Sequence, residues 1–154
     1  MKRLFFLIGI SILSFWSSAQ EVSKESKLDR TVRNWQSFRT ENNVSIDYRF
    51  ADCDASIGYD KEVVQLKMTN NSSEKVELNY HVYLYYNGIC KTCDFPQEYV
   101  YSVTLEPNQT IEGSCGLEYD SRITYFSRFI DASYKGNQQL TGFDLHGLTI
   151  KPIK

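Results

Sequence analysis

Apolar and polar residues alternate along most of the chain after Asn43. In the segment 44–50, VSIDYRF, apolar side chains occupy every second position, and segments 62–69 and 75–86 repeat this period of two. Such a period separates the side chains onto the two faces of a β-strand, whereas a helix needs a period near 3.6. The pattern predicts further strands at 98–105, 110–115, 122–130 and 143–150. We therefore expect about seven strands.

Short polar turns separate the predicted strands. TNNSSEK, residues 69–75, and EPNQ, residues 106–109, contain the Asn, Ser and Pro residues that close tight connections. Short connections join antiparallel neighbours, so the chain is expected to be all-β, an antiparallel β-sandwich of immunoglobulin or fibronectin type. A β-barrel is the alternative. His146-Gly147 interrupts the last alternating segment, and a β-bulge at Gly147 would restore its register.

The first 19 residues have the pattern of a secretory signal peptide. Lys2 and Arg3 precede an apolar run, and small residues at 17–19 precede a cleavage point. The run is shorter than the roughly 20 apolar residues that span a bilayer. We expect export to the periplasm or beyond, with no membrane anchor after cleavage.

The remaining chain is expected to form one domain. Residues 20–34 are polar and are interpreted as a mobile lead-in, although Leu28, Val32 and Trp35 share one face of a possible helix. Residues 35–154 carry the alternating pattern and form the predicted β-sandwich domain.

The charge balance bears on the choice of partner. The chain has a formal net charge of −2, and removal of Lys2 and Arg3 with the signal peptide makes it −4. Binding to nucleic acid or to an anionic membrane depends on clustered Lys and Arg, and the chain has no basic run. The expected partner is a protein, a glycan or an envelope component, and we expect no cofactor.

Four cysteines fall on loops that the predicted strand directions bring to one end of the domain. In an exported protein, an even set of cysteines predicts disulfides. The preferred pairing joins Cys93 to Cys115 and Cys53 to Cys90. Each such bond closes a loop of roughly 20–40 residues and contributes about 3–4 kcal/mol.

The spacing of Cys90 and Cys93 leaves two other interpretations open. A Cys-x-x-Cys pair can serve a thiol-disulfide enzyme, but a lowered thiol pKa usually needs a helix N-terminus, and these residues lie in a predicted hairpin loop. A zinc site usually combines two such motifs, and the chain has one.

The same end of the domain carries candidate ligand-binding residues. Carboxylates at loop positions could support a calcium-dependent binding module. The segment from Asp52 begins like an EF-hand loop, but its glycine is one place late and Val63 stands at the twelfth position. The candidate ligand surface comprises Asp52, Asp54, Tyr59, Asp60, Asp94 and Phe95.

A second candidate surface is the tyrosine-rich strand face around Tyr83, Tyr85 and Tyr99.

The sequence contains little evidence for catalysis. Neither His81 nor His146 belongs to a metalloprotease helix, and the chain has no Gly-x-Ser-x-Gly elbow or phosphate-binding glycine loop. We expect a binding protein rather than an enzyme, with no metal site.

Several segments taken together resemble a known kind of protein. They are VVQLKMTNNSSEKVELNYHVYLYY, the loop with Cys90 and Cys93, LEPNQTIEGSC and FDLHGLTI. Over residues 44–150, they are similar to small exported bacterial proteins of unknown function. This resemblance implies an immunoglobulin-like sandwich and supplies no catalytic residue.

Overall fold

The computed structural model of the chain describes residues 26–53, 56, 60–116, 119–131 and 138–154. The predicted signal peptide, Asp54 and Tyr59 lie outside these residues. The strands are β1 (Ser26–Lys27), β2 (Gln36–Glu41), β3 (Val44–Cys53), β4 (Lys61–Asn70), β5 (Val76–Tyr86), β6 (Ile89–Cys90), β7 (Val100–Leu105), β8 (Thr110–Glu112), β9 (Thr124–Phe129) and β10 (Leu140–Pro152).

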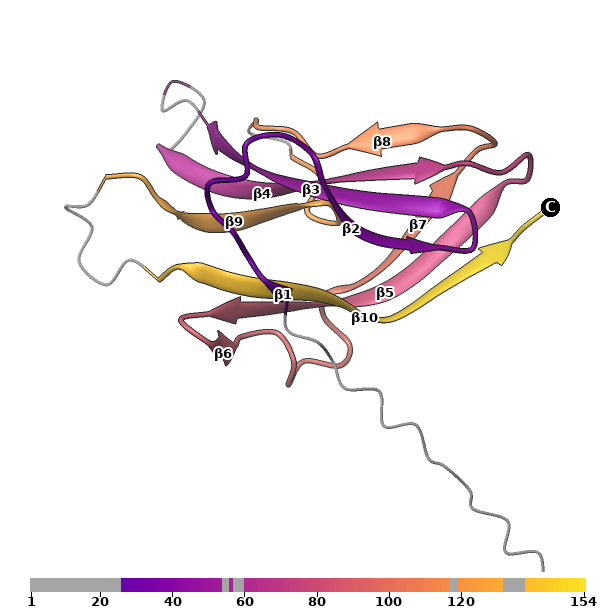
Figure 1. Cartoon of the computed structure of the whole chain (residues 1–154). Coiled ribbons are helices and arrows are strands. Elements are labelled where there is room, and N and C mark those ends of the chain that lie inside the picture. Colours follow the sequence, from indigo (N-terminus) through magenta and orange to yellow (C-terminus); the bar gives the residue numbers. More distant parts are fainter. Residues whose placement is uncertain (1–25, 54–55, 57–59, 117–118, 132–137) are drawn as a thin grey trace, which may run out of the picture.

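These strands form two antiparallel sheets that pack face to face (Figure 1). One sheet has the order β1-β10-β5-β6, and β7 also pairs with β5. The other has the order β2-β3-β4-β8, and β9 also pairs with β4. The all-β prediction and the sandwich of two antiparallel sheets are confirmed.

The core lies between the two sheets and follows the predicted alternation. In β5, the buried side chains of Val76, Leu78, Tyr80 and Val82 alternate with less buried neighbours. Strand β4 departs from this alternation, because the side chains from Glu62 to Leu66 are all buried. The apolar pattern in the sequence therefore predicts the buried face of β5 but not the burial of both faces of β4.

The predicted bulge in the last strand is present. The pairing of β10 with β5 shifts register between His146 and Thr149, and Gly147 has a φ of 63°. Glycine adopts this left-handed conformation without the steric strain caused by a Cβ atom. The bulge lets β10 continue pairing with β5 on both sides of the interruption.

Strand β2 was missed by the sequence analysis. It pairs with β3 through a two-residue turn at Asn42 and Asn43, whose φ angles are 47° and 61°. Two positive φ angles define the type I′ turn that suits a hairpin, and Asn is favoured there. The Asn-Asn pair is the local signal that could have revealed β2.

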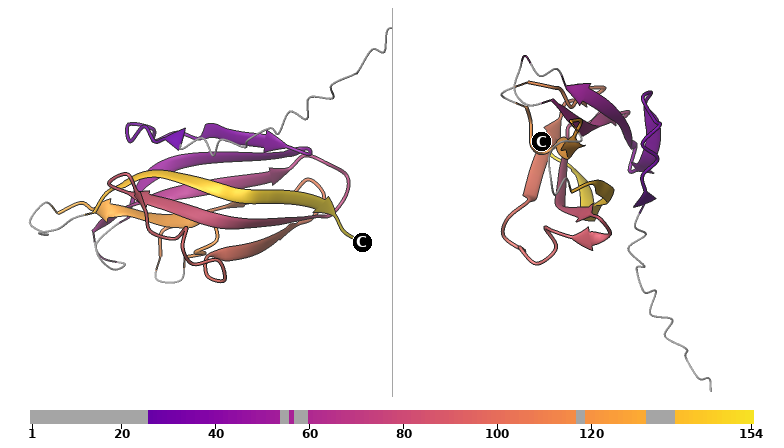
Figure 2. Two further views of the ribbon diagram at one scale, coloured as in Figure 1. Left: turned by 90° about the horizontal axis from the view of Figure 1, so that it is seen from below. Right: turned by 90° about the vertical axis from the view of Figure 1, so that its left-hand side faces the viewer.

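Residues 26–34 contact the sandwich along one side (Figure 2). Strand β1 pairs with β10, and the Phe50 N–H donates to the Val32 carbonyl over 2.9 Å. The end of this segment leads to Trp35, whose ring lies 4.4 Å from the Arg49 guanidinium carbon. The segment assigned to the lead-in is therefore attached to both sheets.

Candidate functional site

The two disulfides differ from the preferred pairing. Cys53 is bonded to Cys115, and Cys90 is bonded to Cys93. All four cysteines are thus in disulfides, as expected, but the prediction of Cys93–Cys115 and Cys53–Cys90 is wrong. The end of β3 and the β5–β6 hairpin do lie at the same end of the sandwich, but they belong to different sheets (Figure 1).

The loop closed by Cys90 and Cys93 fills a gap along the edge of β5. Strand β5 pairs with β7 up to His81 and with β6 only from Tyr85, so residues 82–84 have no strand partner on this side. The Thr92 hydroxyl donates to the Val82 carbonyl over 2.7 Å and accepts from the Leu84 N–H over 2.9 Å. This buried hydroxyl satisfies the two groups that a neighbouring strand would otherwise satisfy.

Two further main-chain hydrogen bonds complete this edge. The Lys91 N–H donates to the Leu84 carbonyl over 2.8 Å, and the Val82 N–H donates to the Tyr99 carbonyl over 2.9 Å. The loop between β6 and β7 is therefore fixed to β5 at both of its ends.

Beside this loop lies a groove of about 280 Å³, which we call the tyrosine groove. Its size is close to the lower limit for small-ligand pockets, about 300 Å³. It lies between β5 and β7 of one sheet and β9 of the other. The lining residues are Val82, Leu84, Tyr86, Lys91, Thr92, Tyr99, Tyr101, Tyr119, Ser121, Thr124, Tyr125 and Phe126. Lys91 is the one charged residue among these described lining residues.

Tyr99 stands out on the rim of the tyrosine groove. Its φ is 58°, and its side chain is 39% exposed. A positive φ is strained for a bulky residue, and such strain concentrates at binding and active sites. Tyr119, on the same groove, is also 39% exposed. Large aromatic side chains thus remain accessible here although their burial would be favourable.

The backbone edges around the groove are partly occupied by side chains. The Tyr86 hydroxyl donates to the Phe126 carbonyl over 2.6 Å, and Arg122 donates from Nη1 to the Ser102 carbonyl over 3.3 Å. The Tyr80 hydroxyl donates to the Arg122 carbonyl over 3.0 Å. Side chains that cover edge carbonyls hinder the addition of a further strand, so a ligand would be recognised chiefly through rings and hydroxyl groups.

Thr124 has a buried hydroxyl without a hydrogen-bond partner. This oxygen would lie 2.6 Å from a Cβ atom placed on Gly113, and the Ile123 carbonyl oxygen would lie 2.5 Å from it. Gly113 therefore permits a close approach of the chain to β9. Thr124 also lines the tyrosine groove, but its buried hydroxyl oxygen packs against Gly113.

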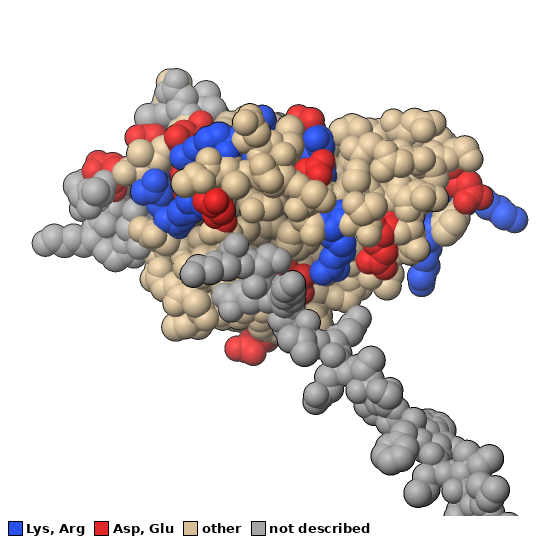
Figure 3. Space-filling view, in the orientation of Figure 1, with Lys and Arg blue, Asp and Glu red and all other residues tan. Residues whose placement is uncertain are grey.

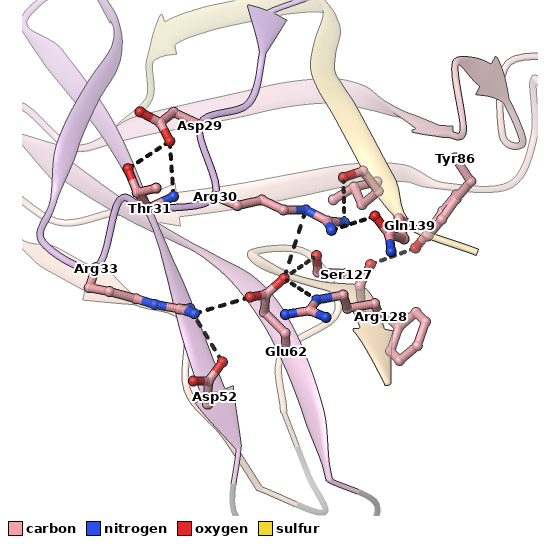
Figure 4. Close-up of polar contacts among 12 residues, drawn as sticks. Asp29, Arg30, Thr31, Arg33, Asp52, Glu62, Tyr86, Ser127, Arg128 and Gln139 are labelled. Carbon is pink, nitrogen blue, oxygen red and sulfur yellow. Dashed lines mark hydrogen bonds and ion pairs between the residues drawn. The ribbon is translucent and has the colours of Figure 1, made fainter. Parts of the chain in front are cut away.

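On the far side of β9, a buried carboxylate holds the N-terminal segment against the sandwich (Figure 4). Glu62, whose side chain is 1% exposed, accepts from Arg33 and Arg128 over 3.2 Å each and from Ser127 over 3.0 Å. Arg30 lies 4.0 Å away, and burial lowers the pKa of its guanidinium. A buried carboxylate needs such partners because desolvation of a lone charge is unfavourable.

Arg33 also pairs with Asp52 over 3.3 Å. On the face seen in Figure 3, basic and acidic side chains are interspersed and form no patch of a single sign. The Glu62 contacts therefore form a structural ionic cluster that links the N-terminal segment to β4 and β9.

The other predicted ligand residues are not brought into one site. Asp52 and Asp60 flank β3 and β4, whereas Asp94 and Phe95 lie in the loop between β6 and β7. Phe95 is 48% exposed and does not line the groove. Among the described residues, no three His, Cys, Asp or Glu side chains gather into a group that could hold a metal ion.

The predicted tyrosine face is divided in the same way. Tyr83 lies on the outer face, where its ring stacks on His146 with centroids 4.3 Å apart. Tyr99 belongs to the groove with Tyr86, Tyr101 and Tyr119, which the sequence analysis did not group together. These residues come from separate segments, so no local sequence motif joins them.

A second hollow of about 350 Å³ lies at the opposite end of the sandwich. It is lined by turn residues and strand ends, namely Asn42, Asn43, Ser72, Glu74, Val76, Ile150 and Pro152. These described lining residues are mainly polar, and none of them is aromatic. The tyrosine groove is the better candidate for a binding site.

These features define a class of protein: an all-β sandwich of two antiparallel sheets with two disulfides. In the part of the chain that the structure describes, no helix has the length and apolar character needed to cross a membrane. Comparison with family models, with curated proteins and with solved structures gave no match. The sequence was expected to resemble small exported bacterial proteins. The comparisons identify no family to which this resemblance would correspond.

Proposed function

We propose that the protein is an exported, non-enzymatic binding module with an immunoglobulin-like sandwich, and that its ligand occupies the tyrosine groove. The ligand is a protein, glycan or envelope component that presents a neutral or anionic group. Lys91 is the one charged residue among the described residues that line the groove, and its charge favours such a group over a cationic one.

The observation that carries this proposal is the conformation of Tyr99. A large ring is held accessible on a strained backbone, although glycine would fit the same φ without strain. Tyrosine gives a large, rigid contact area with a polar tip at low cost in conformational entropy, which explains its frequent use in binding surfaces. A ligand contact made by this ring would explain why tyrosine occupies a position that glycine fits without strain.

Two observations support the finer parts of the proposal. Strand β4 lies beside β9 and β5 beside β10, as the B strand lies beside E and C beside F in immunoglobulin domains. The disulfides are consistent with an oxidising compartment outside the cytoplasm, and the first 19 residues have a signal-peptide pattern.

Capture of ligands from the producing cells tests the proposal. The mature parent, a Tyr99→Gly, Tyr119→Ala double variant and a Tyr83→Ala control are immobilised, and bound proteins and glycans are identified. Tyr83 is the matched control because its ring lies on the outer face. We expect the double variant to lose ligands that the parent and the control retain. Equal recovery by all three proteins would contradict the proposal.

A further inference from the structure

We propose that the Cys90–Cys93 disulfide is a reversible thiol–disulfide exchange site, whereas Cys53–Cys115 is a permanent structural bond. The two bonds differ in what they connect. Cys53 and Cys115 are 62 residues apart and join the end of β3 to the segment after β8. Cys90 and Cys93 are three residues apart and lie within one loop. Breaking the second bond therefore separates no distant parts of the fold.

The loop has anchors that do not depend on its disulfide. Thr92 bonds to Val82 and Leu84 through its hydroxyl, and the Lys91 N–H bonds to the Leu84 carbonyl. Beyond Cys93, the Phe95 N–H donates to the Thr92 carbonyl over 3.2 Å. These hydrogen bonds hold the two cysteines close together after reduction. The disulfide can therefore re-form without a rearrangement of the backbone.

The two sulfurs are not equivalent. The Cys93 N–H donates to the Cys90 Sγ over 3.1 Å. After cleavage, the same N–H would stabilise a thiolate on Cys90, as hydrogen bonds to a charged form do. The cationic Lys91 follows Cys90 directly and adds to this effect. No helix N-terminus contributes, because the described residues around the pair form a strand and turns.

The exchange consumes two external thiols. A thiolate attacks the Cys93 Sγ, the bond between the cysteines breaks, and Cys90 leaves as the stabilised thiolate. A second thiol then attacks the external sulfur of the mixed disulfide, which releases Cys93 as a thiol and joins the two external sulfurs. Two electrons pass from the external thiols to the Cys90–Cys93 pair. The reverse sequence reoxidises the pair.

The surroundings suit a thiol on a protein as well as a small thiol. Ile89 precedes Cys90 and is 60% exposed, and Phe95 follows Cys93 by two residues and is 48% exposed. Exposed apolar groups on both sides of the pair give a protein partner a contact surface. Both kinds of partner share the same chemistry, so the test includes both.

A redox titration of the mature protein tests the proposal. The protein is equilibrated in glutathione buffers of graded ratio, or with a reduced Cys-x-x-Cys dithiol protein, and is then acid-quenched, alkylated and mapped by mass spectrometry. We expect Cys90 and Cys93 to become reduced together while Cys53–Cys115 stays intact and the near-UV circular dichroism persists. In a time course at equal thiol concentrations, faster reduction by the dithiol protein than by glutathione would indicate a protein partner, and the reverse a small thiol. Reduction of both disulfides only on unfolding would overturn the proposal.

A pair of single variants tests the assignment of the two sulfurs. Cys93→Ser leaves the Cys90 thiol beside an unchanged N–H at position 93, and Cys90→Ser leaves the Cys93 thiol without that contact. At pH 6, we expect iodoacetamide to alkylate Cys90 several-fold faster than Cys93 in native protein, because reaction requires the thiolate. Equal rates, with near-UV circular dichroism showing both variants folded, would exclude the stabilised thiolate and with it the proposed exchange site.

Discussion

The Tyr86 hydroxyl donates to the Phe126 carbonyl over 2.6 Å and thereby joins the two sheets across their open edge. Tyr80 makes a similar bond to the carbonyl of Arg122, and Tyr125 bonds to the same carbonyl over 2.7 Å. Burial raises the pKa of all three phenols above the usual value of 10. A phenol donates this bond only while it is protonated, so the contacts depend on pH.

The first prediction is a loss of stability at alkaline pH. The raised pKa values belong to the folded state, so their stabilising effect is complete below the unfolded-state pKa near 10. As pH rises above 10 toward the folded-state values, each group lowers the free energy of unfolding by about 1.4 kcal/mol per pH unit.

Urea unfolding between pH 8 and 12 measures this effect. Tyr86→Phe should lower stability by about 1 kcal/mol at pH 7 through the lost hydrogen bond, and should also reduce the alkaline slope. A parent protein of constant stability from pH 9 to 11 would contradict the prediction.

The second prediction concerns the strain at Tyr99. Glycine adopts a positive φ freely, whereas alanine loses the ring but keeps the steric conflict. We expect Tyr99→Gly to be more stable than Tyr99→Ala by about 1 kcal/mol. Thermal unfolding of both variants checks this order. If Tyr99→Ala were the more stable of the two, the backbone at residue 99 would not be strained.

The third prediction separates the two disulfides by stability. In the chain-entropy model, a bond between residues 62 apart contributes about 4 kcal/mol, whereas one between residues three apart contributes about 2 kcal/mol. We expect Cys53→Ser, Cys115→Ser to destabilise the protein by about 2 kcal/mol more than Cys90→Ser, Cys93→Ser. Each double variant avoids an unpaired thiol. Equal losses in urea unfolding would show that loop length does not determine their contributions.

The fourth prediction concerns Thr92. Thr92→Val keeps the side-chain shape but removes the hydroxyl, which leaves the Leu84 N–H and the Val82 carbonyl without this partner. A buried group without a partner costs about 1–3 kcal/mol. Thr92→Ser is the matched control, because it retains the hydroxyl and should recover most of the lost stability. A valine variant as stable as the parent would show that water replaces the hydroxyl.

The fifth prediction concerns the ionic cluster at Glu62. Glu62→Gln removes the charge that three arginines approach, and we expect it to destabilise the domain by about 2–4 kcal/mol. Asp52→Asn is the control, because Asp52 is 55% exposed and its pair with Arg33 should contribute about 0–1 kcal/mol. Urea unfolding compares the two. A larger loss for Asp52→Asn would contradict the assignment of Glu62 as the centre of the cluster.

Alternation in the sequence identified strands that bury one face in the core. It did not identify β2, which has no fully buried residue on either face. Alternation identified β5, because Leu78 and Val82 must enter the core. Strand β2 has Phe38 as its one apolar residue, and the position of Phe38 depends on stacking against Phe143, with ring centroids 4.6 Å apart. Such a contact between distant segments leaves no periodic pattern.

The disulfide pairing failed for a related reason. Alternating strand directions predict which end of the domain a cysteine reaches, but not which sheet carries it. Strands β3 and β8 belong to the same sheet, which brings Cys53 near Cys115, whereas Cys90 lies in the other sheet. The tyrosine groove was missed likewise, because its walls come from both sheets and the loops between them.

The pairing of β1 with β10 joins the first and last strands that the structure describes. A ribosome delivers Ser26 long before Phe143, its partner in this pairing. Strand β1 must therefore remain without this partner until the other described strands have been made. Contacts between residues so far apart in sequence also slow folding. A chain that stops short of β10 therefore leaves β1 and one edge of β5 open to other chains.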